Sequence, residues 1–157
     1  MKRLITTLST ISLIFLNSCG FKVVNLSNFE NYNILEIQSS GDSRINYIIK
    51  NNFPKIQSNI SKKDIIISLQ TKRDKNVKEK NIKNEITKYT ITITTNIKII
   101  IVKNNQSINF TKSIAGAYEI SKQNLTSKSN EKELVKLLSN NLAQEIIKEA
   151  AIKLNDI

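Results

Sequence analysis

The segment from Ile86 to Val102 constrains the fold more than any other part of the sequence. Its residues alternate between an apolar set and a polar set. The apolar set consists of Tyr89, Ile91, Ile93, Ile97, Ile99 and Ile101. The polar set consists of Lys88, Thr90, Thr92, Thr94, Asn96 and Lys98. Alternation in β-branched residues is typical of an antiparallel strand with one buried and one wet face. The chain therefore needs a sheet whose apolar face is covered by another layer.

Three more strands are expected beside this one. The turn Asn104-Asn105-Gln106 predicts a hairpin, and the returning strand presents an apolar set to the same face, namely Ile108, Phe110, Ile114, Tyr118 and Ile120. Asp64 to Gln70 has the same period, with Ile65, Ile67 and Leu69 on one side. Tyr32 to Gln38 is a short strand that Ser39-Ser40-Gly41 brings to an end.

Two amphipathic helices supply the covering layer. Asp42 or Ser43 is the expected cap of a helix that ends at Pro54 and carries Ile45, Ile48, Ile49 and Phe53 at helical spacing. A second helix is expected to begin near Ser129 or Asn130, where Asn130-x-x-Glu133 has the spacing of a capping box. Its apolar stripe consists of Leu134, Leu137, Leu138, Leu142, Ile146, Ala150 and Leu154.

The fold class that follows is α+β, in the order β-α-β-β-β-α. Two helices on one face of a four-stranded, mostly antiparallel sheet form a two-layer sandwich that buries both apolar stripes. We assign residues 32–157 to this single domain, residues 1–18 to a signal peptide and residues 19–31 to a lipidated tether.

The residue types present exclude several kinds of chemistry. The sequence has no His and one Cys, which removes His-based acid–base catalysis, Cys–His nucleophiles and Cys/His zinc sites. We therefore expect no enzyme activity, no metal and no cofactor. The net charge of +11 favours anionic partners such as phospholipid headgroups or lipopolysaccharide, while the export signal indicated by the basic start and the apolar run of the first 18 residues argues against nucleic acid. A coding bias toward Lys explains the same excess, and the composition does not separate the two explanations.

The N-terminus has the layout of an export signal. Lys2 and Arg3 precede a mostly apolar run of about 13 residues, which is shorter than the roughly 20 residues that span a bilayer. Leu16-Asn17-Ser18-Cys19-Gly20 resembles the lipobox of bacterial lipoproteins, in which the thiol of Cys19 receives a diacylglyceryl group. Gly20 after the cysteine implies, by the same resemblance, sorting to the outer membrane with the protein facing the periplasm.

The layout as a whole resembles the LPS-assembly lipoprotein LptE family. The resemblance rests on Cys19-Gly20-Phe21, the early strand and helix, the long Ile/Thr hairpin, the late Tyr118 and the C-terminal amphipathic helix. It implies a non-enzymatic partner that plugs the outer-membrane β-barrel LptD, assists its assembly and serves lipopolysaccharide transport to the outer leaflet. Two alternatives remain: an auxiliary lipoprotein of another lipid-transport system, or a regulator of a cell-wall enzyme.

A basic segment is the candidate lipopolysaccharide contact. From Lys72 to Lys83, six basic residues stand against two acidic ones, and we expect this segment to be a loop between two strands. Four of its cations are suited to phosphate groups, namely Lys72, Arg73, Lys75 and Lys78. A solvated loop that protects a hairpin end is the competing interpretation.

Two further features are candidates for contacts with partners. The polar face from Thr90 to Lys98 is suited to the polar lumen of a barrel, with plain solvent exposure as the alternative. Tyr118 is expected to pack in the core rather than to touch a ligand.

Overall fold

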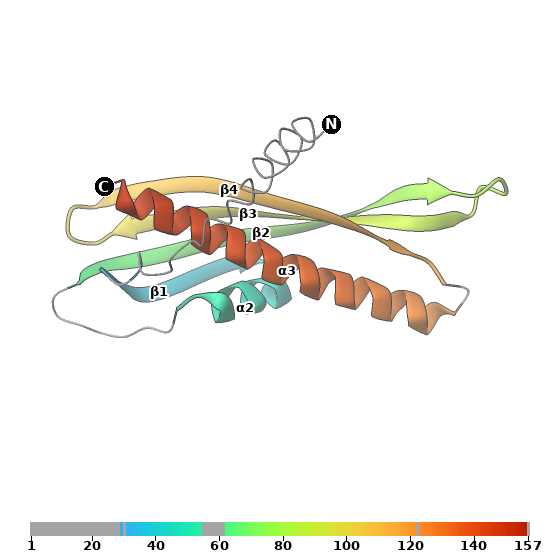
Figure 1. Cartoon of the computed structure of the whole chain (residues 1–157), viewed down its shortest axis with the longest axis horizontal. Coiled ribbons are helices and arrows are strands. Elements are labelled where there is room, and N and C mark those ends of the chain that lie inside the picture. Colours follow the sequence, from blue (N-terminus) through green and yellow to red (C-terminus); the bar gives the residue numbers. More distant parts are fainter. Residues whose placement is uncertain (1–28, 30, 55–61, 122, 157) are drawn as a thin grey trace, which may run out of the picture.

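The structure is a computed structural model that describes residues 29, 31–54, 62–121 and 123–156. Its elements follow the predicted order β-α-β-β-β-α. They are β1 (Tyr32–Gly41), α2 (Ser43–Asn52), β2 (Lys63–Lys80), β3 (Ile86–Ile101), β4 (Gln106–Glu119) and α3 (Asn124–Asn155). The strands form one sheet in the order β1-β2-β3-β4, and both helices lie on the same side of it (Figure 1). The predicted two-layer sandwich is confirmed.

The sheet is mixed, with one parallel pair. β1 and β2 run parallel because α2 carries the chain across between them, whereas β2, β3 and β4 are joined by hairpins and pair antiparallel. A bulge at Leu35 shifts the β1 register, so that Ile34 and Ile37 both face the inner side opposite Ile65 and Ile67. The inner apolar face therefore continues across all four strands.

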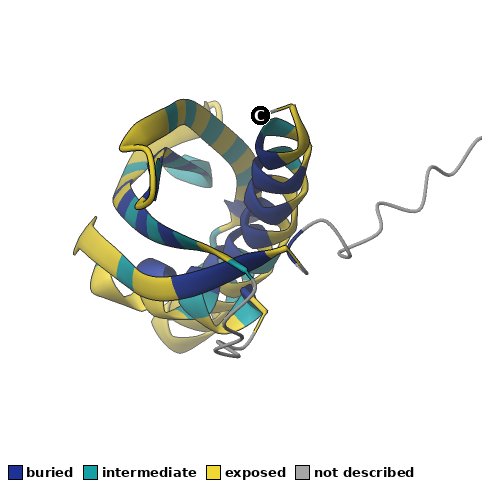
Figure 2. Ribbon diagram, turned by 90° about the vertical axis from the view of Figure 1, so that its left-hand side faces the viewer, coloured by how far each residue is buried: buried dark blue, intermediate teal, exposed yellow. Residues whose placement is uncertain are grey.

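The core lies between this inner face and α3, as the view along the molecule shows (Figure 2). The odd-numbered residues of β3 from Ile91 to Ile101 are buried, as the alternation predicted. Among them Thr95 is polar, and its hydroxyl pairs with that of Thr71 at 2.9 Å. Gly116 allows α3 to approach β4 closely, because a Cβ there would lie 2.9 Å from a methyl carbon of Leu134.

Helix α2 begins as the sequence predicted. The Asp42 carboxylate accepts hydrogen bonds from the backbone N–H groups of Arg44 and Ile45, both at 3.1 Å. These bonds satisfy two of the free donors at the helix N-terminus. Ile45 and Ile49 are fully buried, and Phe53 packs edge-on against Phe29 with ring centroids 6.3 Å apart. Phe29 thus belongs to the packed core, although it falls within the predicted tether.

Two predicted boundaries were wrong. The segment that begins at Lys72 is not a loop, because β2 continues as a strand to Lys80 and pairs with β3 up to that residue, with a bulge after Val77. The expected capping box at Asn130 does not form either, because α3 begins at Asn124 and Asn130 lies inside it. Most of the predicted α3 stripe is buried, but Leu137 is 56% exposed.

Candidate functional site

The outer face of the sheet, opposite the helices, is the first candidate site. Its side chains stand in rows that follow the strand register. One row contains Gln38, Ser68, Lys98 and Asn109, and the next contains Ser40, Gln70, Asn96 and Thr111. Short hydroxyl and amide groups thus occupy the middle of this face, where a three-layer fold would carry a second set of apolar side chains.

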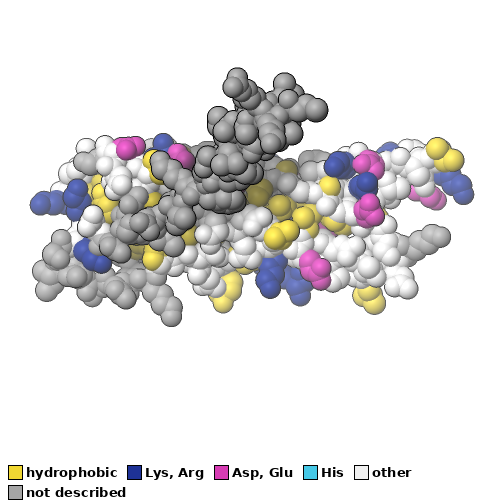
Figure 3. Space-filling view, viewed as in Figure 1, with side chains coloured by type: hydrophobic (Ala, Val, Ile, Leu, Met, Phe, Trp, Pro, Cys, Tyr) yellow, Lys and Arg dark blue, Asp and Glu magenta, His cyan; other side chains and the backbone are white. Residues whose placement is uncertain are grey.

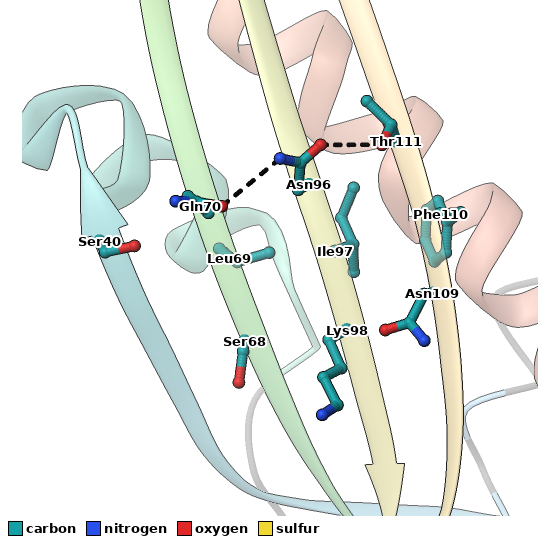
Figure 4. A pocket seen from close by; sticks show the side chains of 10 residues that line it. All are labelled: Ser40, Ser68, Leu69, Gln70, Asn96, Ile97, Lys98, Asn109, Phe110 and Thr111. Carbon is teal, nitrogen blue, oxygen red and sulfur yellow. Dashed lines mark hydrogen bonds between the residues drawn. The ribbon is translucent and has the colours of Figure 1, made fainter.

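Hydrogen bonds across the strands hold these rows in place. Thr111 Oγ1 donates to Asn96 Oδ1 at 2.8 Å, and Asn96 Nδ2 donates to Gln70 Oε1 at 3.5 Å (Figure 4). One row further along, the hydroxyls of Thr94 and Ser113 lie 2.9 Å apart. These contacts fix the side chains of a surface that is otherwise open to water, so the face is ordered before any partner arrives.

A trough of about 550 Å³ runs across the same rows, from Ser40 on β1 to Thr111 on β4. In the part of the chain that the structure describes, the side chains of Lys98 and Asn109 in this trough make no hydrogen bond or ion pair with protein. They remain available to a partner. The trough can form hydrogen bonds to a polar surface, and Lys98 adds one positive charge.

Charges on the outer face largely cancel one another. Lys72 Nζ lies 2.8 Å from Asp74, and Lys88 Nζ lies 3.1 Å from Glu79 and 3.5 Å from Glu119. The hydrogen bond and charge of Glu79 raise the pKa of Lys88. The outer face is therefore polar without a strong field of either sign.

The predicted basic segment does not form one cluster. Because it is a strand, alternate residues point to opposite faces of the sheet. Lys72 lies on the outer face, whereas Arg73 and Lys75 point to the inner side, where each meets a carboxylate. Lys78 is exposed at a bulge between Val77 and Glu79. These four residues therefore lie on two faces of the sheet, and lipopolysaccharide contact by them stays a prediction.

Lys75 belongs to a cluster that joins the sheet to α3. Its Nζ lies 2.6 Å from Glu131 and 4.3 Å from the centre of the Tyr89 ring. Tyr118 Oη donates to the same Glu131 carboxylate at 2.7 Å, and its ring centroid lies 5.9 Å from that of Tyr89. Tyr118 is buried, as predicted, but it also makes this polar contact, which the sequence analysis missed.

The cluster shifts the pKa values of its members. Burial acts to raise the pKa of Glu131, but the hydrogen bonds and charge of Lys75 outweigh it and lower that pKa. Burial likewise acts to lower the pKa of Lys75, and the contacts with Glu131 and Tyr118 raise it instead. Burial raises the pKa of Tyr118. Lys75 and Glu131 are therefore both charged at neutral pH.

The sequence contains a pattern that would have predicted more of the polar outer face than β3. The predicted polar face covers β3 alone, yet Ser107, Asn109, Thr111 and Ser113 occupy every second position of β4. Ser68 and Gln70 extend the pattern to β2. Glu131 carried no such signal, because its partner Lys75 lies far away in the sequence.

Other predictions fall partly or wholly outside the described residues. Cys19, the predicted lipidation site, lies there. Within the described ranges, no group of three or more Asp, Glu, Cys or His side chains is arranged to hold a metal ion. No described helix combines the length and the apolar character needed to cross a membrane.

The fold has counterparts among solved structures. Rare lipoprotein B from Shewanella oneidensis superposes with a TM-score of 0.60 at 14% identity, covering 78% of this chain and 98% of that one. This chain shares the fold of that structure. A lipoprotein from Caulobacter crescentus matches with a TM-score of 0.54 at 9% identity, over 83% of this chain and 95% of the other. Lipoprotein B from Nitrosomonas europaea gives 0.52 at 14% identity, over 76% and 82%.

Sequence comparison gives no assignment. No family model matches the chain, and no curated protein matches it. At identities of 9 to 14%, the structural likeness establishes the fold alone. The fold is consistent with the resemblance to LPS-assembly lipoproteins stated above.

Proposed function

We propose that this protein is a lipoprotein of the outer membrane, anchored through Cys19, that plugs an LptD-like β-barrel and assists its assembly. In this role it serves lipopolysaccharide transport to the outer leaflet and catalyses no reaction. The observation that carries the proposal is the outer sheet face, which is polar, ordered and nearly balanced in charge across all four strands.

Such a face is suited to the inside of a barrel. The lumen of an outer-membrane barrel is polar, so a plug gains little from apolar side chains on the surface that meets it. Hydroxyl and amide groups exchange their bonds to water for bonds to the lumen wall, and side chains fixed beforehand lose less conformational entropy on binding. The ordered Gln70–Asn96–Thr111 row meets both conditions.

The anchor is supported by two independent observations. The sequence has a single cysteine, and it stands directly after an export-type signal with a small residue before it. Three solved structures with the same fold are named as lipoproteins. Two or three acyl chains on Cys19 would hold the protein durably, at about 0.8 kcal/mol per buried CH₂.

Purification of the lipidated protein from solubilised outer membranes, followed by mass spectrometry of the proteins that accompany it, tests the proposal. We expect a large LptD-like β-barrel in near-stoichiometric amount. Lipid-transport proteins without a barrel would instead favour the auxiliary-lipoprotein alternative. A Cys19→Ser variant is the control for the anchor, and we expect it to leave the membrane fraction.

A further inference from the structure

The far end of the β2–β3 hairpin projects beyond the rest of the sheet. β1 stops at Gly41, which pairs with Thr71, and the last β4 residue, Glu119, pairs with Lys88. β2 and β3 continue past both neighbours to a turn over residues 81–85 (Figure 1). We call this projecting turn, with the strand ends that lead to it (residues 78–86), the hairpin tip.

The turn at the tip is held by several hydrogen bonds. Asn81 Oδ1 accepts from the backbone N–H groups of Lys83 and Glu85, both at 2.9 Å, and Asn81 Nδ2 donates to the Glu85 carboxylate at 2.7 Å. Asn84 adopts a positive φ of 61°, and its backbone N–H donates a hydrogen bond to the Asn81 carbonyl. The turn is therefore ordered rather than a loose connection.

This ordered turn presents one large apolar side chain to solvent. Ile82 is 104% exposed, the highest value among the exposed large hydrophobic residues of the described chain. A single exposed apolar residue is common on protein surfaces. Here, however, the residue stands at the apex of a turn whose other groups are bonded to one another, at the end of a projecting hairpin.

Three lysines lie close to Ile82 in the sequence of the tip. Lys78, Lys80 and Lys83 form no ion pair among the residues that the structure describes, and Lys80 Nζ donates a hydrogen bond to Asn84 Oδ1 at 3.0 Å. Of the nearby acids, Glu79 pairs with Lys88, whereas Glu85 accepts from the neutral amide of Asn81 and keeps its charge. The space-filling view shows hydrophobic and basic side chains at this end of the molecule, with acidic ones beside them (Figure 3). The tip thus combines an apolar apex with a cationic rim.

An apolar apex with a cationic rim matches the surface of an anionic bilayer. The apolar group enters the boundary of the acyl chains, while lysine stems lie along it and their ammonium groups stay with the headgroup phosphates. A tip that only protected the hairpin end from aggregation would need the lysines and would gain nothing from an exposed isoleucine.

We propose that the hairpin tip is a second membrane contact, in which Ile82 enters an anionic phospholipid surface and Lys78, Lys80 and Lys83 bind its phosphates. The tip lies at the opposite end of β2 from Lys63, the end at which Phe29 and Tyr32 lead in from the proposed anchor. Two attachments at opposite ends set the long axis along the membrane. The inference concerns the anchored protein before it meets a barrel, so it goes beyond the proposed function.

The absence of tryptophan makes a direct test available. The lipidated Ile82→Trp variant is reconstituted into vesicles, and its emission reports the tip alone. The matched control is Leu137→Trp in the middle of α3, away from both ends of the sheet, where the replaced residue is 56% exposed and lies next to Lys136. Vesicles contain either an anionic phosphatidylglycerol mixture or phosphatidylcholine only, each with and without brominated acyl chains as quenchers.

We expect the Ile82→Trp emission to move to shorter wavelength and to be quenched by brominated chains in anionic vesicles, with a much weaker effect in phosphatidylcholine. Replacing Lys78, Lys80 and Lys83 by Gln in the same background weakens the contact on the order of 100-fold. Unchanged emission in anionic vesicles, or equal quenching of Leu137→Trp, overturns the proposal. If flotation shows no acyl anchoring, the proposed function is at fault, and the same variants mixed with vesicles still decide the tip contact.

Discussion

At the scale of single residues, Gly41 is the position where the backbone leaves no room for a side chain. It ends β1 with a φ of +89°, and a Cβ built there would lie 1.9 Å from the carbonyl oxygen of Thr71. That same carbonyl accepts the backbone N–H of Asp42, the residue that caps α2. The close approach therefore couples the end of a strand, the start of a helix and the neighbouring strand.

We expect Gly41→Ala to destabilise the fold by about 3 kcal/mol, since it combines an unfavourable φ with a backbone clash. Urea unfolding followed by circular dichroism measures the change. Ser39→Ala, at an exposed position two residues earlier, is the matched control and should shift the midpoint little. Equal midpoints for the two variants would mean that the turn relaxes without cost.

The ion pair between Lys75 and Glu131 makes stability depend on pH. The lowered pKa of Glu131 means that the native carboxylate stays charged at pH values where the unfolded one takes up a proton. The pair's contribution is therefore complete above about pH 4.3, the usual unfolded value, and is lost as pH falls through the lower native pKa. Because the pKa of Lys75 is raised, the pair's contribution to stability is lost at high pH only above about pH 10.4, the usual unfolded value.

Glu131→Gln should therefore lower the free energy of unfolding by up to about 1 kcal/mol at pH 7, with the difference from wild type shrinking below about pH 4. Urea unfolding at several pH values measures it. Glu133→Gln, on the same helix and in no ion pair among the described residues, provides the comparison and should show no such dependence. A difference that persists unchanged to pH 3 would point to packing rather than charge.

At the scale of elements, the long helix α3 shows how far periodicity carries a prediction. The stripe from Leu138 to Leu154 was identified correctly, since each of these residues at helical spacing is buried. Leu137 fitted the same stripe and is nevertheless exposed, because the buried arc of the helix is set by where β4 and α2 lie. The sequence does not contain those positions.

We expect Leu142→Ala to cost about 3 kcal/mol, as is typical when a fully buried leucine leaves a cavity. Leu137→Ala, which removes the same atoms from an exposed site on the same helix, should change stability by less than about 0.5 kcal/mol. Thermal or urea unfolding of both variants measures the contrast. Similar losses would mean that α3 turns a different face toward the sheet.

The two misplaced boundaries have a common physical cause. The apolar alternation of β2 ends at Leu69, and the charged residues that follow are typical of a loop. They form a strand because β3 pairs with them and because Asp42 and Glu131 neutralise the two cations on the inner side. α3 likewise begins early, at Asn124, where Ser127 exchanges hydrogen bonds with the backbone of Ser121. These partners are set by tertiary structure, which local sequence patterns do not report.

At the scale of the whole molecule, the sheet has one face that holds the fold together and one face that the fold does not need. The inner face carries the core, so changes there unfold the protein. The outer face carries rows of polar side chains whose removal costs only surface hydrogen bonds. The alternation of apolar and polar residues along β3 predicts this division from the sequence alone. Because of it, an interaction surface can be altered without loss of the fold.

The division predicts that outer-face variants separate binding from stability. Thr92→Lys with Thr94→Lys places two long cations in the middle of the outer face, where they would clash with a close-fitting lumen wall. Asn141→Lys with Ser129→Lys adds the same charge to exposed positions of α3. We expect the free energy of unfolding of both double variants to stay within about 1 kcal/mol of the wild-type value. Only the outer-face pair should lose the co-purifying barrel in quantitative pull-downs from outer membranes. If the α3 double variant loses the barrel and the outer-face double variant keeps it, the plug presents its helices to the lumen. The polar outer face would then only be exposed to water.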